Sequence, residues 1–151
     1  MRRSGPMAVA TLNPASCRCV EGFVREALGC ACPPAVFENI RLETNPAGFP
    51  DTPGARLLAI GGRLLVLLVD AMPADLATGQ INRLLLAGRD LRDAGRFNRF
   101  RLVVVALPDC DPGMLTTIET AGITPPDDRV HLHALSASQL PALLRASREA
   151  P

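Results

Sequence analysis

The chain has 151 residues, of which 48% are hydrophobic and 21% charged, with a net charge of +1 at pH 7. These values are ordinary for one globular domain, and they exclude a disordered chain or a strongly basic nucleic-acid-binding protein. Lysine is absent, which excludes mechanisms that need a lysine amine. Tyrosine and tryptophan are also absent, so few aromatic side chains are available to stack on bases, and this counts against nucleic acid as a partner.

The predicted domain organisation is a flexible N-terminus over residues 1–15, followed by a single α/β domain over residues 16–151. Residues 16–28 carry apolar side chains at helical spacing, and Gly29 follows where a helix ends. Residues 36–44 alternate between apolar and polar side chains, which predicts a strand buried on one face only. We therefore expect this strand at an edge of the sheet, where it offers a route to a homodimer.

The clearest signal is a hairpin of residues 55–60 and 63–70, joined by Gly61 and Gly62. Residues 64–69 are all aliphatic, so we expect a central strand buried on both faces. Five elements should follow: a helix over 75–94, a strand over 101–107, a short helix over 112–121, a strand over 129–135, and a last helix begun by a capping box of Ser136 and Gln139.

The predicted fold class is therefore α/β, with element order αβββαβαβα, an antiparallel meander running into a parallel βαβαβ half, and helices on both faces of a mixed sheet. This order resembles the core of the restriction-endonuclease-like folds. Such nucleases place an acidic residue, and a lysine two positions later, on the third strand. Leu65, Val66 and Leu67 stand there instead, so the resemblance implies the architecture without the nuclease activity.

Two pairs of cysteines suggest a metal site: Cys17 with Cys19, and Cys30 with Cys32. The two pairs flank the first helix and are separated by roughly 20 Å of helix, so they cannot share one ion if both ends are helical. Cys30 and Cys32 follow the helix in a loop, which favours them as ligands of zinc or an Fe–S cluster. The alternative is that they are ordinary buried thiols.

Three further residues could complete that metal site: Cys110, His131 and His133. The two histidines lie two positions apart on a predicted strand and so share a face. Alternate strand positions also often hold core-flanking side chains without any ligand. An accessory or interaction protein carrying this thiol-based centre is the first functional hypothesis.

Carboxylates at the carboxyl ends of the parallel strands suggest a second hypothesis. Asp70 ends one strand, and Asp109 and Asp111 follow the next. Ligands bind at this edge in open α/β sheets, and carboxylates are ligands of Mg²⁺, so these residues could serve a magnesium-dependent hydrolase. In the alternative, Asp111 caps a helix and Asp109 closes a turn.

An arginine-rich segment suggests a third hypothesis, a phosphate- or nucleic-acid-binding module. Its arginines are Arg83, Arg89, Arg92, Arg96, Arg99 and Arg101. Arg89, Arg92 and Arg96 share one face of the predicted helix. Asp90 and Asp93 interrupt the segment, which makes a self-paired, solvated face the simpler explanation.

The expected location of the protein in the cell follows from its apolar runs and its cysteine count. No apolar run approaches the roughly 20 residues that span a bilayer, so we expect no membrane insertion. The first twelve residues contain no secretory apolar core, and the cysteine count is odd. We therefore expect reduced thiols and a cytoplasmic protein.

Overall fold

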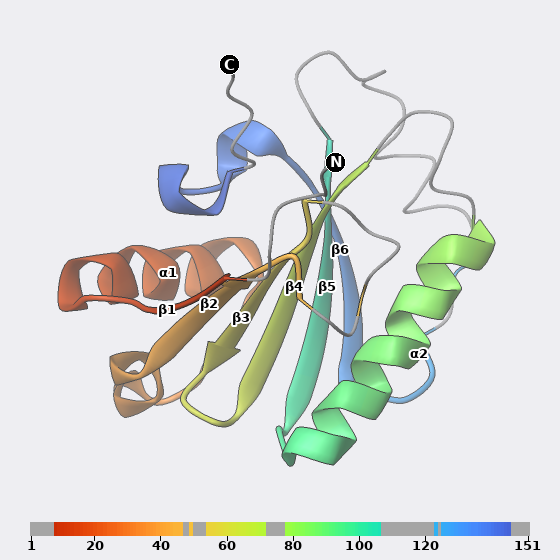
Figure 1. Cartoon of the computed structure of the whole chain (residues 1–151), viewed down its shortest axis with the longest axis horizontal. Coiled ribbons are helices and arrows are strands. Elements are labelled where there is room, and N and C mark those ends of the chain that lie inside the picture. Colours follow the sequence, from red (N-terminus) through yellow and green to blue (C-terminus); the bar gives the residue numbers. More distant parts are fainter. Residues whose placement is uncertain are drawn as a thin grey trace.

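A computed structural model describes residues 8–46, 49, 54–71, 78–106, 123 and 125–145. Its centre is one six-stranded sheet in which the strands lie side by side in chain order (Figure 1). The strands are β1 (Ala8–Thr11), β2 (Ile40–Thr44), β3 (Arg56–Ile60), β4 (Leu64–Ala71), β5 (Arg99–Ala106) and β6 (Val130–Ser136). The strands from β1 to β4 pair antiparallel, and β4, β5 and β6 pair parallel. The predicted mixed α/β sheet is confirmed.

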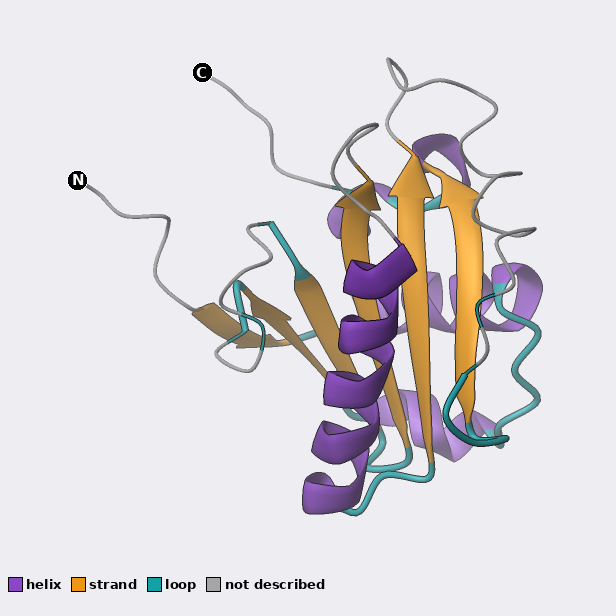
Figure 2. Ribbon diagram, turned by 90° about the vertical axis from the view of Figure 1, so that its right-hand side faces the viewer, coloured by secondary structure: helices purple, strands orange, loops and turns teal. Residues whose placement is uncertain are grey.

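The two long helices cover opposite faces of the sheet (Figure 2). Helix α1 (Pro14–Ala27) packs over the face that carries Val66 and Val103, and helix α2 (Thr78–Gly95) packs over the face that carries Leu65 and Leu102. All six residues of the aliphatic run 64–69 are buried, because β4 is covered on both faces and paired on both sides. The prediction of a buried central strand is confirmed.

Helix α1 begins directly after a polar cap, Asn13. The Oδ1 atom of Asn13 accepts a hydrogen bond from the backbone N–H of Ser16 at 2.8 Å, and Pro14 occupies the first turn, where no N–H is needed. At the other end, Gly29 has a φ of +71°, which a glycine adopts without steric cost. This turn directs the following cysteine-bearing loop back toward the sheet.

The strand predicted at the sheet edge is not at an edge. β1 pairs with β2 from Ala8 opposite Thr44 to Thr11 opposite Arg41, and β3 pairs with its other side. The prediction was wrong because four residues of the N-terminus, expected within a flexible segment, add a strand there. Residues 36–38 of the predicted strand belong instead to a 3-10 helix, Pro34–Glu38, and the backbone of β2 is not free for pairing with a second copy.

The end of the described chain also differs from the prediction. Two 3-10 turns, Ala137–Gln139 and Ala142–Leu144, stand where one helix was expected. The predicted contact is present, since the backbone N–H of Ser136 donates to Oε1 of Gln139 at 2.9 Å. Pro141 follows directly and has no N–H for an α-helical turn. The helix predicted over 112–121 lies outside the described residues.

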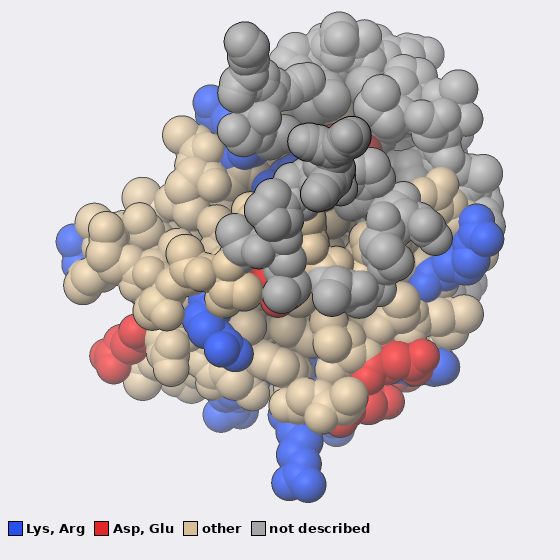
Figure 3. Space-filling model, in the orientation of Figure 1, with Lys and Arg blue, Asp and Glu red and all other residues tan. Residues whose placement is uncertain are grey.

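Charge is mixed over the face of the molecule in Figure 3, where acidic side chains lie beside basic ones over the lower part of α2. The surface gives no extended field of one sign there, in keeping with the net charge of +1. None of the helices in the described part of the chain is long and apolar enough to cross a membrane.

Candidate anion-binding site

A polar corner lies on the α1 face of the sheet, where β5 and β6 begin. Arg99 and Arg101 of β5 share this face with His131 and His133 of β6, because side chains on a strand alternate with a period of two. Further along the same strands the face becomes apolar and joins the core under α1. The corner is thus a polar end to an otherwise hydrophobic layer.

Arg101 is the most buried member of this corner, with 8% of its surface exposed. Its Nη1 donates to the carbonyl oxygen of Leu28 at 3.0 Å and to Nε2 of His133 at 2.9 Å. Its Nε has no hydrogen-bond partner, and no carboxylate of the described residues forms an ion pair with it. Burial lowers the pKa of Arg101, and the guanidinium remains an uncompensated positive charge.

The two histidines accept hydrogen bonds from arginines instead of pairing with acids. Nη1 of Arg99 lies 3.2 Å from Nε2 of His131, parallel to the Arg101 contact with His133. A guanidinium only donates, so each Nε2 is the unprotonated acceptor and the imidazoles are neutral. Burial, and then the charge of Arg101, lower the pKa of His133 to about 4 and also lower that of His131.

The loop after α1 brings Cys30 and Cys32 against this corner. The backbone N–H of Cys30 donates to the carbonyl of Val24 at 3.2 Å, and Nη2 of Arg25 donates to the carbonyl of Cys32 at 2.8 Å. With the Leu28 carbonyl bound by Arg101, three contacts hold this short loop. Its position is therefore fixed by both the helix and the sheet.

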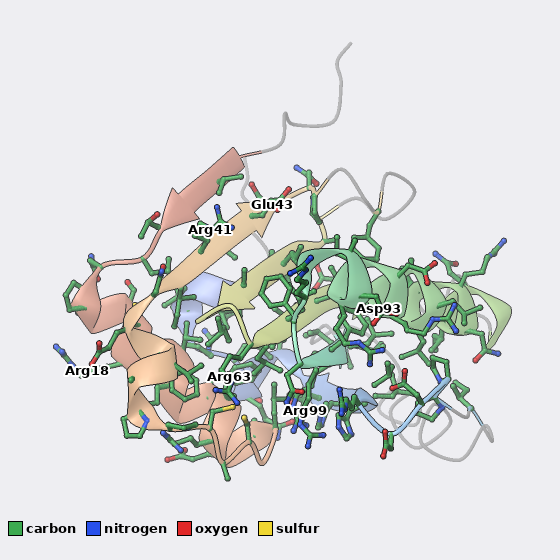
Figure 4. The ribbon with its side chains drawn as sticks, turned by 90° about the horizontal axis from the view of Figure 1, so that it is seen from below. Arg18, Arg41, Glu43, Arg63, Asp93 and Arg99 are labelled. Atoms are coloured by element: carbon green, nitrogen blue, oxygen red, sulfur yellow. The ribbon has the colours of Figure 1, made fainter. Side chains whose placement is uncertain are left out.

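A cavity of about 450 Å³ opens between the loop and the sheet. Three arginines and both cysteines line it, together with backbone and small neighbours: Gly29, Cys30, Ala31, Cys32, Pro33, Arg63, Leu64, Asn98, Arg99 and Arg101. Arg63, in the turn between β3 and β4, and Arg99, at the start of β5, lie on the same side of the molecule in Figure 4. None of the described residues that line the cavity is acidic.

The pKa of Cys32 is set more by burial and by Cys30 than by the arginines of the cavity. Burial, a hydrogen bond with the Cys30 side chain and the charge of Cys30 raise the pKa of Cys32 to about 11, while Arg101 and Arg63 act in the opposite direction. The two sulfurs therefore interact with each other and with the same guanidinium groups. All four cysteines of the described chain are free thiols.

The predicted metal ligands come only partly together. Cys30 and Cys32 line one cavity together with Arg101, and His133 is hydrogen-bonded to Arg101. Cys110 lies outside the described residues. Among the residues that the structure describes, no three histidine, cysteine, aspartate or glutamate side chains are grouped to hold a metal ion. The Nε2 atoms of His131 and His133 already accept arginine N–H groups.

Asp70, the first of the predicted carboxylates, is engaged in an ion pair. Both of its oxygens accept from Arg56, with N–O distances of 3.2 Å, and Arg56 is 5% exposed. A carboxylate paired in this way is a poor ligand for a second cation. Asp109 and Asp111 lie outside the described residues, so their meeting with Asp70 stays a prediction.

The predicted phosphate-binding face of α2 is largely self-paired. Arg89 contacts Asp90 at 3.1 Å, and Arg92 turns inward, where it is bound by Asp93 and by both oxygens of Asp127 at 2.9 Å. Arg96 is exposed at the end of the helix. Of the three, only Arg96 forms no ion pair with a described residue.

The arginines that do converge are Arg63, Arg99 and Arg101, which the sequence did not identify as a group. Two of them belonged to the arginine-rich segment, but the segment was interpreted as one helical face. The available signal was the alternation itself: Arg99 and Arg101 are separated by the buried Phe100, and the histidines repeat this spacing one strand later. Arg63 joins them only through the hairpin turn.

Comparison of the chain with models of known families, with curated proteins and with solved structures gave no match.

Proposed function

We propose that this domain is a non-catalytic binding module for a small phosphate-bearing molecule, which occupies the cavity lined by Arg63, Arg99 and Arg101. The observation that carries this proposal is the buried Arg101, whose guanidinium faces the cavity and has no acidic partner among the residues that the structure describes. Proteins seldom bury a charge unpaired, because desolvation costs several kcal/mol per ion. A bound anion supplies the missing countercharge.

The cavity favours an oxyanion over an apolar ligand. Three guanidinium groups provide up to fifteen N–H donors between them, and the hydrogen bonds to Leu28, His131 and His133 engage only a few of these. Arginine binds phosphate through paired, charge-assisted hydrogen bonds that are roughly twice as strong as neutral ones. A volume of about 450 Å³ exceeds the needs of a bare ion and fits the range of small-molecule sites.

Phosphate is favoured over carboxylate on the basis of charge. A phosphate monoester carries a charge of about −1.5 to −2 and three acceptor oxygens, whereas a carboxylate carries one charge and two oxygens. Three neighbouring cations repel one another, as the lowering of the Arg101 pKa by Arg99 indicates. The ligand that relieves this repulsion most is the more highly charged anion.

Calorimetric titration with inorganic phosphate and acetate tests the proposal. Phosphate should bind more tightly than acetate, and the affinity should fall with added salt. Arg63→Gln and Arg99→Gln should each weaken phosphate binding by about tenfold or more. Arg41→Gln, at a position in β2 that is exposed and away from the cavity lining, is the matched control and should leave it unchanged. Phosphate binding that all three variants retain would disprove the proposed site.

A metal or Fe–S centre at Cys30 and Cys32 stays the second candidate. It is favoured by the one cavity that both sulfurs line, and it needs further ligands from outside the described residues. Zinc and iron analysis of protein purified without oxygen decides it: metal bound in the parent chain and lost in Cys30→Ser supports this centre. We propose the cytoplasm as the location for either candidate, because free thiols persist in a reducing compartment.

A further inference from the structure

We propose that Cys30 and Cys32 form an oxidisable dithiol, which a peroxide converts into a disulfide within the loop. This inference goes beyond the anion site and does not depend on it. Three observations carry it: the two sulfurs line one cavity, the loop that carries them is held in place, and cationic side chains lie beside them.

The spacing of the two residues permits the bond. A disulfide needs Cα atoms about 4.4–6.8 Å apart, and residues two positions apart are at most about 7 Å apart even when the chain is fully extended. The side chains of Cys30 and Cys32 already interact directly, since Cys30 is among the groups that raise the pKa of Cys32. The spacing along the chain therefore permits an S–S bond within the loop.

Arg101 and Arg63 give the pair its chemistry. A thiolate is the nucleophile in reactions with peroxides, and a nearby cation stabilises it. Burial and the neighbouring Cys30 raise the pKa of Cys32 to about 11, so the thiolate is a minor population, and Arg101 and Arg63 act in the opposite direction, toward the thiolate. No carboxylate among the described residues competes for Arg101, so its charge is available to the sulfurs.

The reaction balances with the peroxide as oxidant. The thiolate of one cysteine attacks a peroxide oxygen, the O–O bond breaks, and after proton transfer an alcohol or water leaves, which gives a sulfenic acid. The sulfur of the second cysteine then attacks that sulfenic sulfur, an S–S bond forms, and the S–O bond breaks to release water. Two thiols are thus oxidised by two electrons, and one peroxide is reduced.

Cys17 and Cys19 provide an internal control with the same spacing. Both lie on α1, where residues two positions apart point about 200° apart around the axis. Cys17 is buried against the sheet, its Sγ donating to the carbonyl of Leu12 at 3.6 Å, whereas Cys19 is exposed. This pair lacks the geometry for a disulfide, and the separate cavity that Cys17 lines has one arginine, Arg18, beside Glu21 and Glu38.

The experiment treats the full chain, in a Cys110→Ser background, with one equivalent of hydrogen peroxide, followed by denaturation, N-ethylmaleimide and trypsin. Cleavage after Arg25 and Arg41 leaves Cys30 and Cys32 in one peptide, whereas cleavage after Arg18 separates Cys17 from Cys19. We expect the peptide 26–41 to lose two hydrogen atoms and take up no label. Cys17 and Cys19 should each take up one.

Variants separate the outcomes. In Cys30→Ser or Cys32→Ser, dimedone should trap the remaining sulfur as a sulfenic acid, because no second thiol is there to displace water. Arg63→Gln should slow the oxidation, because it removes a cation that favours the thiolate of Cys32. Two labels on peptide 26–41 after peroxide, or equally fast oxidation of Cys17 and Cys19, would overturn the proposal. Phosphate titration of the same samples tests the anion site separately.

Discussion

The guanidinium of Arg101 and the imidazole of His133 face each other between neighbouring parallel strands, with Nη1 of the arginine 2.9 Å from Nε2 of the histidine. The contact requires a neutral histidine, since a protonated ring would place two donors against each other. It leaves the arginine charged but without an anion. The pairing thus holds Arg101 toward the cavity and makes the protonation of His133 costly.

Stability should therefore fall in mildly acidic solution. The pKa of His133 is about 4 in the folded chain and 6.5 in the unfolded chain. Between these pH values the unfolded chain binds more protons, so a fall in pH favours unfolding. The contribution is complete above 6.5 and is lost as the pH falls toward 4, up to about 3 kcal/mol. Urea unfolding at several pH values should show a flatter profile for His133→Gln; an unchanged slope would contradict the neutral histidine.

The ion pair of Arg92 and Asp127 should stabilise the fold at neutral pH. The hydrogen bonds from Arg92, and then from the backbone N–H of Arg129, lower the pKa of Asp127 to about 2 from 3.8. This contribution is complete above 3.8 and disappears as the pH falls through 2. The Asp127 side chain is 34% exposed, so screening limits it to about 1 kcal/mol. Asp127→Asn should cost this at pH 7 and nothing near pH 2, as measured by urea unfolding.

The two buried arginines should respond differently to the same substitution. Arg56 is paired with Asp70, so Arg56→Met strands a carboxylate and should cost about 3 kcal/mol. Arg101 has no acidic partner among the described residues, so Arg101→Met should change the free energy of unfolding by less than about 1 kcal/mol while it weakens phosphate binding. Equal destabilisation by both would show that Arg101 is a structural residue.

The contact between α2 and β5 depends on a glycine. A Cβ on Gly88 would lie 2.1 Å from the Phe100 ring, whereas one on Gly22 of α1 would meet nothing within 4 Å. Gly88→Ala should therefore destabilise the fold by about 1–3 kcal/mol, despite the better helix propensity of alanine. Gly22→Ala should stabilise it by up to about 1 kcal/mol. Thermal unfolding of both variants checks this; a neutral Gly88→Ala would contradict the close approach.

The sequence predicted the sheet well because its signals are local. The aliphatic run 64–69 and the hairpin glycines define β3 and β4 without long-range information. Strand β1 was missed because its four residues, Ala8–Thr11, are stabilised by pairing with β2 across about thirty residues of chain. A short segment carries too little periodicity to predict such a partner.

The candidate site was predicted only in part for a similar reason. Cys30 and Cys32 stood out as a local pair, but the arginines around them come from a turn and from alternate positions of β5. Their convergence depends on the register of three strands. The arginines of α2, which share a helical face in the sequence, are neutralised by Asp90, Asp93 and Asp127, and Asp127 is distant along the chain.

The anion site is tested most directly by the arginine side chains themselves. In a protein labelled with ¹⁵N, each guanidinium Nε–H gives its own signal, and Arg101 Nε is buried without a partner. Titration with inorganic phosphate should shift the signals of Arg63, Arg99 and Arg101 together, with one common dissociation constant, and leave those of Arg18 and Arg41 in place. Shifts spread equally over all five arginines, or none at Arg101, would contradict the proposed function.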